Sequence, residues 1–177
     1  MATVGRPRPG FDVELRTDDG PVADGEVGRI WVRSDTVMSG YWRDPVATAE
    51  ALRDGWLRTS DLGRWQGDRL VVVGRADDMF IRGGYNVHPL AVEQVLAAHP
   101  AVAQVAVAPR ADDVMGQVGV AVVVAHAPVT LDELRGFAAA TLPKHALPED
   151  LLLVEALPLT AGQKLDRAAL ARLVART

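Results

Sequence analysis

Residues 74–85 read Gly-Arg-Ala-Asp-Asp-Met-Phe-Ile-Arg-Gly-Gly-Tyr, and this stretch separates two halves of the chain that differ in pattern. Its glycines, aspartates and arginines are typical of a turn or connecting segment rather than of a buried element. Upstream, alternating apolar and polar residues predict short strands, and downstream helices alternate with strands. The sequence therefore predicts an α+β fold with a join inside residues 74–85.

The first half predicts a small, mostly antiparallel β unit. Residues 11–15 and 28–33 alternate apolar with polar side chains, and residues 70–73 form a short apolar run that is typical of a buried strand. One helix is predicted over residues 44–52, because Asp-Pro at its start supplies an N-cap followed by a proline suited to the first turn.

The second half predicts an α/β domain. Thr130 and Glu133 have the spacing of a capping box, in which each side chain satisfies a backbone N–H of the other residue. The predicted helices cover residues 90–97, 130–142 and 167–174, and the predicted strands cover residues 102–107, 118–124 and 151–154.

Composition excludes several classes of function. The chain has 177 residues, of which 49% are apolar, so it can bury a core. Its net charge of −4 argues against a nucleic-acid or anionic-membrane partner, and the absence of cysteine excludes disulfides and thiol nucleophiles. There is no apolar run long enough to span a membrane and no apolar segment after the basic N-terminus, so we expect neither a span nor a signal peptide, and a cytoplasmic location fits.

Two polar positions near the join have a functional and a plain interpretation. Asp61 follows a strand-like segment, where a carboxylate can accept two hydrogen bonds from a vicinal diol such as a ribose, or can instead satisfy its own turn. Arg75 offers a planar fork for phosphate or ribose oxygens, and Asp77 with Asp78 completes what is otherwise a solvated, charged turn.

Two further positions lie in the second half. The pair Gly83-Gly84 lets a backbone approach a ligand closely, although a structural turn explains it equally well. Lys164 lies on a glycine-containing loop before the last helix, where it can deliver a point charge to an anion or remain a solvated surface residue. His88 is interpreted as a packing residue or a residue near a helix N-cap.

Five segments, taken in order, resemble the adenylate-forming enzymes, which include acyl-CoA synthetases, the adenylation domains of peptide synthetases and luciferases. The residues of these segments are most similar to those of aryl- and fatty-acid CoA ligases. The segments are Gly-Glu-Val-Gly-Arg-Ile-Trp-Val-Arg-Ser at 25–34, Gly-Tyr-Trp-Arg-Asp-Pro-Val-Ala-Thr-Ala-Glu-Ala at 40–51, Asp-Gly-Trp-Leu-Arg-Thr-Ser-Asp-Leu-Gly at 54–63, the stretch 74–93 that contains the join, and Leu-Pro-Leu-Thr-Ala-Gly-Gln-Lys-Leu-Asp-Arg at 157–167.

The resemblance implies an activity. Members of this family join a carboxylate to ATP, giving an acyl-adenylate and pyrophosphate, and a thiol of CoA or of a carrier protein's phosphopantetheine then displaces AMP. Rotation of the C-terminal domain about a hinge exchanges the geometry of one step for that of the other. The implied cofactors are therefore ATP or AMP, Mg²⁺, and CoA or phosphopantetheine.

The resemblance also assigns roles to single residues. Asp61 corresponds to the acid that holds the ribose hydroxyls of AMP, Arg75 to an arginine that contacts the nucleotide, and Asp77 to the hinge. Gly83 and Gly84 correspond to the loop that lines the pantetheine path. Lys164 corresponds to the lysine that bridges the carboxylate and the α-phosphate during adenylation, where a fixed ammonium stabilises developing negative charge.

By the same resemblance, residues 1–76 are the last β subdomain of the ligase's N-terminal region, and residues 77–177 are the mobile C-terminal domain. The phosphate loop, the Mg²⁺-binding glutamate and the acyl pocket belong to the rest of that N-terminal region. We therefore expect no metal ligand in this chain and no adenylation by this chain alone.

The chain departs from the family pattern at several positions near these motifs. Ser60 replaces a glycine, Gln163 replaces the glycine before the lysine, and Arg82 replaces a small residue beside the thiol path. His145 occupies a position where members of the family often have an aromatic or basic residue. Met115 occupies a position where related CoA ligases can have a tryptophan.

Three hypotheses remain from the sequence. The chain is a piece of an adenylate-forming ligase, or one half of a split ligase whose N-terminal half is a separate chain, or a repurposed, non-catalytic module that binds a carrier protein or a nucleotide. The presence of Asp61, Asp77 and Lys164 together favours the first two.

Overall fold

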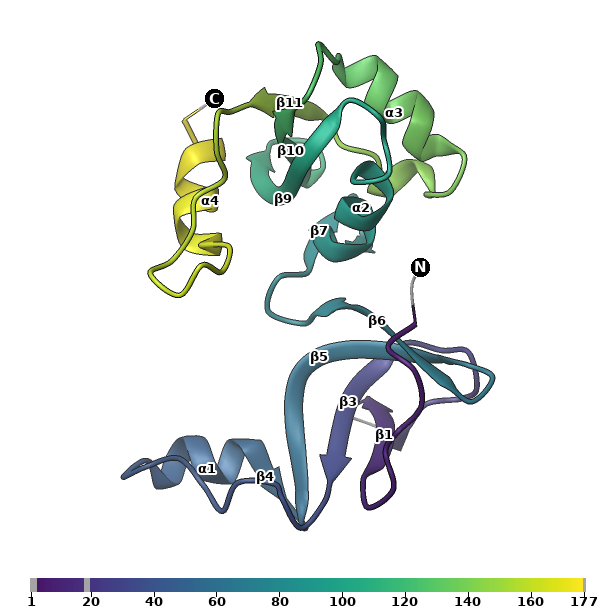
Figure 1. Ribbon diagram of the computed structural model, residues 1–177, viewed down its shortest axis with the longest axis vertical. Coiled ribbons are helices and arrows are strands. Elements are labelled where there is room, and N and C mark those ends of the chain that lie inside the picture. Colours follow the sequence, from purple (N-terminus) through teal and green to yellow (C-terminus); the bar gives the residue numbers. More distant parts are fainter. Residues whose placement is uncertain (1–2, 18–19, 177) are drawn as a thin grey trace. The chain divides into compact units, whose positions relative to one another are not determined.

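The computed structural model describes residues 3–17 and 20–176. The chain divides into two compact units, Met1–Asp77 and Asp78–Thr177, called here the first and second units. The division falls inside the stretch that the sequence indicates as the join. Figure 1 shows a β-rich first unit and a second unit that carries three α-helices.

The first unit is an antiparallel sheet with the strand order β2-β1-β3-β5-β4. The strand β6 also pairs with β5, along residues 61–66. The long strand β5 can pair with three neighbours because it spans eleven residues and bends along its length. The strands are β1 (Asp12–Thr17), β2 (Gly20–Pro21), β3 (Gly28–Arg33), β4 (Leu52–Arg53), β5 (Trp56–Gln66) and β6 (Arg69–Arg75).

One helix, α1 (Pro45–Ala51), interrupts this sheet and begins as predicted. The Asp44 side chain accepts a hydrogen bond from the Ala47 N–H at 2.9 Å, and Pro45 occupies the first turn. No residue of α1 is buried within the described part of the chain. The core of the first unit lies instead between strands and includes Leu15, Ile30, Trp31, Trp56, Val71 and Val73.

The second unit is a five-stranded sheet built on the long antiparallel pair β9–β10, with β11 added parallel to β10 and the β7–β8 hairpin joined at Gly116. Its strands are β7 (Phe80–Arg82), β8 (Tyr85–Val87), β9 (Val102–Asp112), β10 (Gly116–Ala125) and β11 (Asp150–Leu153). Its helices are α2 (Pro89–Leu96), α3 (Leu131–Ala139), the 3-10 helix η1 (Lys144–Ala146) and α4 (Arg167–Val174).

Helices cover both faces of this sheet (Figure 1). Ala121 and Val123 of β10 pack with α2 and α3 on one face, whereas Val120 and Val122 pack with α4 on the other. Successive strand residues point to opposite faces, so a strand covered on both faces needs apolar side chains at every position. This explains the continuous apolar run of β10 and confirms the predicted α+β class.

Several element bounds differ from the predictions. The helix predicted to continue to residue 142 ends at Ala139, and β9 extends five residues beyond the predicted strand end because β10 pairs with it along its whole length. The strand β5 carries few strict apolar–polar alternations, so its eleven-residue extent was not predicted. None of the helices in the described ranges is long and apolar enough to cross a membrane.

Candidate functional site

Asp61 and Arg75 lie directly opposite each other on neighbouring strands. They are register partners in the β5–β6 pair, and Asp61 Oδ1 is 3.8 Å from Arg75 Nη1. The other terminal nitrogen of Arg75, Nη2, is 3.6 Å from Asp77 Oδ2. The first unit therefore brings three of the predicted site residues together.

The position of Asp61 within β5 differs from the prediction that it follows a strand. The register between β5 and β6 shifts between Leu62 and Gly63, next to Asp61, and such a bulge re-aims the side chains around it. Gly63 allows close packing there, because a Cβ would lie 3.0 Å from a side-chain carbon of Ile30 and would force that side chain to shift. Thr59 holds the segment from the other side, since its Oγ1 donates to the Ile30 carbonyl and accepts from the Asp61 N–H.

These carboxylates and the guanidinium are open to a ligand. The Asp61 and Arg75 side chains are 46% and 53% exposed. An ion pair this long and this exposed contributes less than about 1 kcal/mol to folding. Its groups therefore keep most of their hydrogen-bonding capacity, and a carboxylate acceptor beside a forked donor fits a ribose diol next to a phosphate.

Gly83 and Gly84 form the two-residue loop of the β7–β8 hairpin. Their φ angles are +55° and +84°, the left-handed values that a type I′ turn requires at both central positions. Met115 lies against this loop, because Gly83 N–H donates to its carbonyl and its sulfur would be 3.1 Å from a Cβ at Gly83. Nothing in the described structure lies within 4 Å of a Cβ placed on Gly84, which leaves space beside the loop.

The charge of Arg82, next to this loop, is directed inward. Its side chain is mostly buried and pairs with Glu149, which also accepts a hydrogen bond from Arg135 at 3.0 Å. Beside the loop, the Tyr85 and His145 rings stack with their centroids 4.6 Å apart. The surface next to Gly84 is therefore aromatic rather than basic.

Lys164 lies at the end of a narrow loop. The Thr160 N–H donates to the Lys164 carbonyl at 2.7 Å, and Leu159 and Leu165 form a β-bridge. Gln163 has a φ of +58°, so it adopts the left-handed conformation that favours glycine. Lys164 itself is exposed and forms no salt bridge with any residue in the described ranges.

A polar cluster that the sequence interpretation missed lies within the second unit. Arg167, the first residue of α4, binds Glu93 of α2 through two hydrogen bonds of 2.7 and 3.2 Å. Its Nε is 3.4 Å from Asp78 Oδ2. The sequence indicates a solvated turn at Asp78, and no local signal shows that its carboxylate faces Arg167 instead.

His88 is the N-cap residue of α2, in agreement with the prediction, but its side chain does not cap the helix. Its Nδ1 is buried and has no hydrogen-bond partner among the described residues. Burial lowers the pKa of His88 below its usual value of 6.5, because it disfavours the charged imidazolium.

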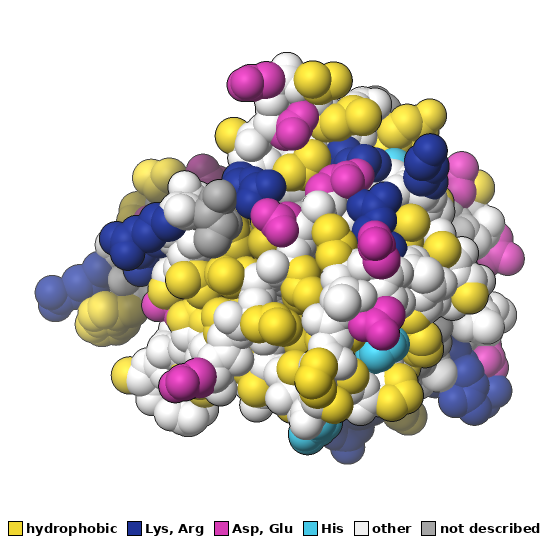
Figure 2. Space-filling view, turned by 90° about the horizontal axis from the view of Figure 1, so that it is seen from above, with side chains coloured by type: hydrophobic (Ala, Val, Ile, Leu, Met, Phe, Trp, Pro, Cys, Tyr) yellow, Lys and Arg dark blue, Asp and Glu magenta, His cyan; other side chains and the backbone are white. Residues whose placement is uncertain are grey.

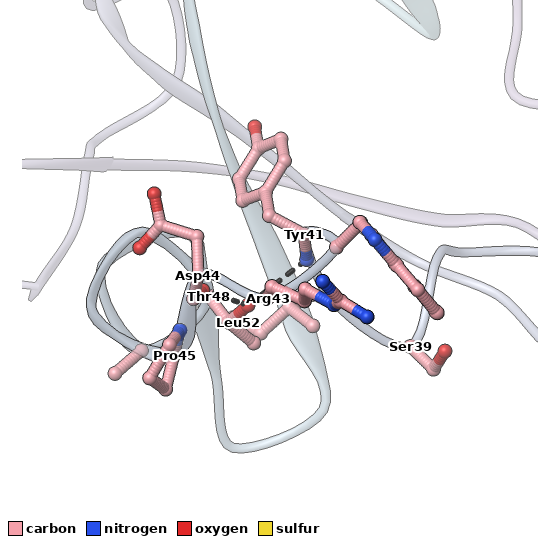
Figure 3. A pocket seen from close by; sticks show the side chains of 10 residues that line it. Ser39, Tyr41, Arg43, Asp44, Pro45, Thr48 and Leu52 are labelled. Carbon is pink, nitrogen blue, oxygen red and sulfur yellow. Dashed lines mark hydrogen bonds between the residues drawn. The ribbon is translucent and has the colours of Figure 1, made fainter.

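The first unit also carries an open hollow of about 560 Å³ around α1, called here the α1 hollow. It is lined by residues 39–45 together with Thr48, Ala49 and Leu52. Figure 3 shows the Thr48 side chain between Tyr41 and Asp44, and its hydroxyl accepts from the Tyr41 N–H and donates to the Asp44 carbonyl. Tyr41 and Trp42 are exposed at its rim.

Charges on the surface are mixed. On the face drawn in Figure 2, basic and acidic side chains lie next to one another. Within residues 3–17 and 20–176 there is no group of three or more histidine or acidic side chains that could hold a metal ion.

Comparison with known proteins connects this geometry to a family. Residues 91–164 match the family described as AMP-binding enzyme C-terminal domain. The chain is 38% identical to an indoleacetate–CoA ligase of Aromatoleum aromaticum, over 98% of this chain and 35% of that protein. It is also 38% identical to a 2-succinylbenzoate–CoA ligase of Geobacillus kaustophilus, over 100% of this chain and 37% of that protein.

Solved structures agree with the sequence matches. The amide bond synthetase McbA of Marinactinospora thermotolerans superposes with a TM-score of 0.92 at 37% identity, over 98% of this chain and 36% of that one. The o-succinylbenzoate CoA synthetase of Bacillus subtilis, in complex with its acyl-adenylate, superposes with a TM-score of 0.90 at 34% identity, over 95% of this chain and 35% of that one. The chain thus spans about a third of the length of the relatives that it matches. In sequence and in fold the chain is similar to the C-terminal portion of adenylate-forming enzymes, and residues 91–164 match their AMP-binding enzyme C-terminal domain.

Proposed function

We propose that the chain is the C-terminal working part of an acid–thiol ligase. The intact enzyme joins a carboxylate to ATP, releases pyrophosphate, and passes the acyl group from AMP to the thiol of CoA or of a carrier protein's phosphopantetheine. The reported relatives are ligases and synthetases, so a non-catalytic binding module is not favoured.

The observation that carries the proposal is the pairing of Asp61 with Arg75. Both side chains are half-exposed, and their contact is too long to be a strong ion pair. In the proposed enzyme, Asp61 accepts hydrogen bonds from the ribose hydroxyls of the nucleotide, and Arg75 donates to a neighbouring ribose or phosphate oxygen. Asp77 holds the guanidinium from its far side.

Lys164 supplies positive charge during the first step. The carboxylate oxygen attacks the α-phosphorus, the bond to pyrophosphate breaks, and negative charge builds between the two reacting anions. An ammonium fixed at that place stabilises the charge in the transition state more than in the separate reactants. The exposed side chain without an ion-pair partner in the described structure is available for this role.

The second step uses a different part of the second unit. We place the thiol path beside Gly83 and Gly84, where the open space next to Gly84 admits a narrow chain such as pantetheine. Asp77 is the proposed hinge, residues 1–76 the last β subdomain of the N-terminal region, and residues 77–177 the mobile domain.

The proposal needs a partner region. An N-terminal ligase region, in the same or a separate chain, supplies the acyl pocket and the ligand for Mg²⁺, and no residue of this chain is assigned to the metal. The enzyme is placed in the cytoplasm, where ATP and CoA are available.

A second acceptor is supported by the likeness to McbA, which is an amide bond synthetase. With an amine in place of the thiol, the first step is unchanged and AMP is displaced to give an amide. The two acceptors are distinguished by supplying CoA or a primary amine to enzyme that carries the acyl-adenylate.

The lysine assignment is tested by ATP–pyrophosphate exchange. The chain is fused to the N-terminal region of the indoleacetate–CoA ligase, so that the acyl substrate is defined. Lys164→Ala should lower exchange by about 100-fold or more, the usual effect of removing one group that stabilises transition-state charge. Lys144→Ala, which removes another exposed lysine, is the matched control and should change exchange by less than about twofold. Equal rates in the two variants would refute the assignment.

A further inference from the structure

We propose that Arg167 is a positioning residue that fixes the Lys164 loop to the start of the second unit. The inference rests on the proposed role of Lys164 in adenylation. Arg167 follows Lys164 by three residues and contacts two segments that are distant from it in sequence, namely Asp78 at the start of the unit and Glu93 on α2.

The contacts of Arg167 use all sides of its guanidinium. Nη1 and Nη2 donate to the two carboxylate oxygens of Glu93 at 2.7 and 3.2 Å, and Nη1 also donates to the Val107 carbonyl at 3.1 Å. Nε faces Asp78 at 3.4 Å. Only a planar fork can hold two carboxylates and a carbonyl in this way, and a lysine ammonium cannot reproduce the geometry.

This cluster is more buried and its contacts are shorter than those of the exposed Asp61–Arg75 pair in the first unit. The Glu93 side chain is 11% exposed, and its Oε1 also accepts the Val107 N–H at 2.8 Å. The Glu93 carboxylate therefore accepts hydrogen bonds from both the Val107 backbone N–H of β9 and the Arg167 guanidinium. A buried carboxylate that loses its charged partner is costly to the fold, so the position of Arg167 is tightly determined.

The position of Arg167 determines that of Lys164, which precedes it by three residues. Between them, Asp166 caps α4 by accepting from the Ala169 N–H at 2.9 Å and donates its own N–H to the Pro158 carbonyl at 2.9 Å. Leu165 packs against the core under α4. The segment therefore has little freedom, and Lys164 follows any movement of the helix start.

Asp78 is the first residue of the second unit and follows the proposed hinge residue Asp77. Its contact with Arg167 ties the point where the chain enters the second unit to the helix that carries the lysine loop. When the second unit rotates about residue 77, Asp78, Arg167 and Lys164 then move together as one rigid group. Without Arg167, residues 78–80 and the loop can move independently.

The experiment compares Arg167→Lys with Arg172→Lys in the fusion described above. Both substitutions keep the charge on α4, but Arg172 is exposed and has no role in the site. The rates measured are ATP–pyrophosphate exchange and thioester formation from added acyl-adenylate, a step that does not use Lys164. Amide hydrogen exchange of residues 159–166 reports the order of the loop directly.

We expect Arg167→Lys to lower kcat for pyrophosphate exchange by about tenfold or more, because misplacement of a charged group by about 1 Å can cost 100-fold. The KM for ATP and the rate of thioester formation should change by less than about twofold, since a lost positioning effect acts only in the transition state of the first step. The amides of residues 159–166 should exchange faster. Arg172→Lys should change none of these quantities.

Asp78→Asn provides a second variant that leaves the Arg167–Glu93 pair intact, in case Arg167→Lys is poorly folded. Asp78→Asn should also lower kcat for ATP–pyrophosphate exchange, by a smaller factor than Arg167→Lys does. Equal loss in both half-reactions, or no loss in either variant, would overturn the positioning role. Lys164→Ala is measured in parallel: if it leaves exchange unchanged, the proposed function fails, whereas an inactive Lys164→Ala beside an unaffected Arg167→Lys refutes the positioning role alone.

Discussion

Gln163 adopts a backbone conformation that favours glycine, with a φ of +58°. A residue with a Cβ in this region carries a strain of about 1–2 kcal/mol. Glycine relieves the strain but adds about 0.4–1 kcal/mol of unfolded-state entropy. Gln163→Gly should therefore raise the free energy of unfolding by about 0.5–1 kcal/mol, measured by urea denaturation.

Gly162 offers the control for that prediction. Its φ is not in the left-handed region, and the nearest atom to a Cβ placed there is 3.8 Å away. Gly162→Ala should therefore not lower stability. If instead Gly162→Ala destabilises and Gln163→Gly does not stabilise, the left-handed conformation belongs to the other residue.

His88 makes the stability of the second unit depend on pH. Burial lowers its pKa below 6.5, so the unfolded chain binds a proton more readily than the folded chain. The contribution of neutral His88 to stability is fully present above pH 6.5. The free energy of unfolding should therefore be lower at pH 5 than at pH 7. His88→Gln should make this fall smaller, as measured by urea unfolding at both pH values.

The exposed His126 is the matched control. His126→Gln should leave the difference in stability between pH 7 and pH 5 as it is in the parent chain. A parent chain with no such difference, or a difference that survives His88→Gln in full, would contradict the assignment to His88.

At the scale of single elements, the capping box of α3 forms as predicted. Thr130 Oγ1 accepts from the Glu133 N–H at 3.3 Å, and Glu133 Oε2 accepts from the Thr130 N–H at 2.8 Å. The backbone N–H and the hydroxyl of Thr130 both donate to the Glu133 carboxylate, and these two hydrogen bonds lower the pKa of Glu133. Their contribution is therefore present above the ordinary pKa of a glutamate and is lost as the pH falls through the lowered one.

Thr130→Ala should lower the free energy of unfolding by about 1 kcal/mol at pH 7, because the hydroxyl that accepts from the Glu133 N–H and donates to the Glu133 carboxylate is lost. Thr141→Ala, at an exposed threonine just beyond the same helix, should have a much smaller effect. Urea unfolding of the two variants side by side measures the difference. Equal effects would mean that the cap does not stabilise α3.

Elements were predictable where local chemistry alone decides them. The helix α4 has the predicted bounds because Asp166 caps it and its apolar residues recur at helical spacing. The register shift in the β5–β6 pair was not predictable, since it lies at Leu62 and Gly63, where Ile30 and Leu70 pack closely from neighbouring strands. Asp61 lies next to that shift, so its placement required the fold.

At the scale of the whole molecule, the sequence located the candidate residues but not their partners. Asp61 and Arg75 are fourteen positions apart, and only the β5–β6 register makes them neighbours. The contact between Asp78 and Arg167 joins the two ends of the second unit and has no local signal. Motif order indicates the candidate residues, whereas tertiary pairing shows which of them lie together.

The α1 hollow has a practical consequence for finding the partner region. Trp42 at its rim is 86% exposed, whereas Trp31 and Trp56 are buried and Trp65 is partly buried. An indole in water emits at longer wavelength than a buried one, so Trp42, the most exposed of the four, contributes a long-wavelength component to the intrinsic fluorescence of this chain. Titration with an N-terminal ligase region that covers the hollow should shift the emission to shorter wavelength and protect it from iodide quenching. Trp42→Phe should abolish both changes, which makes the chain its own unlabelled probe of assembly.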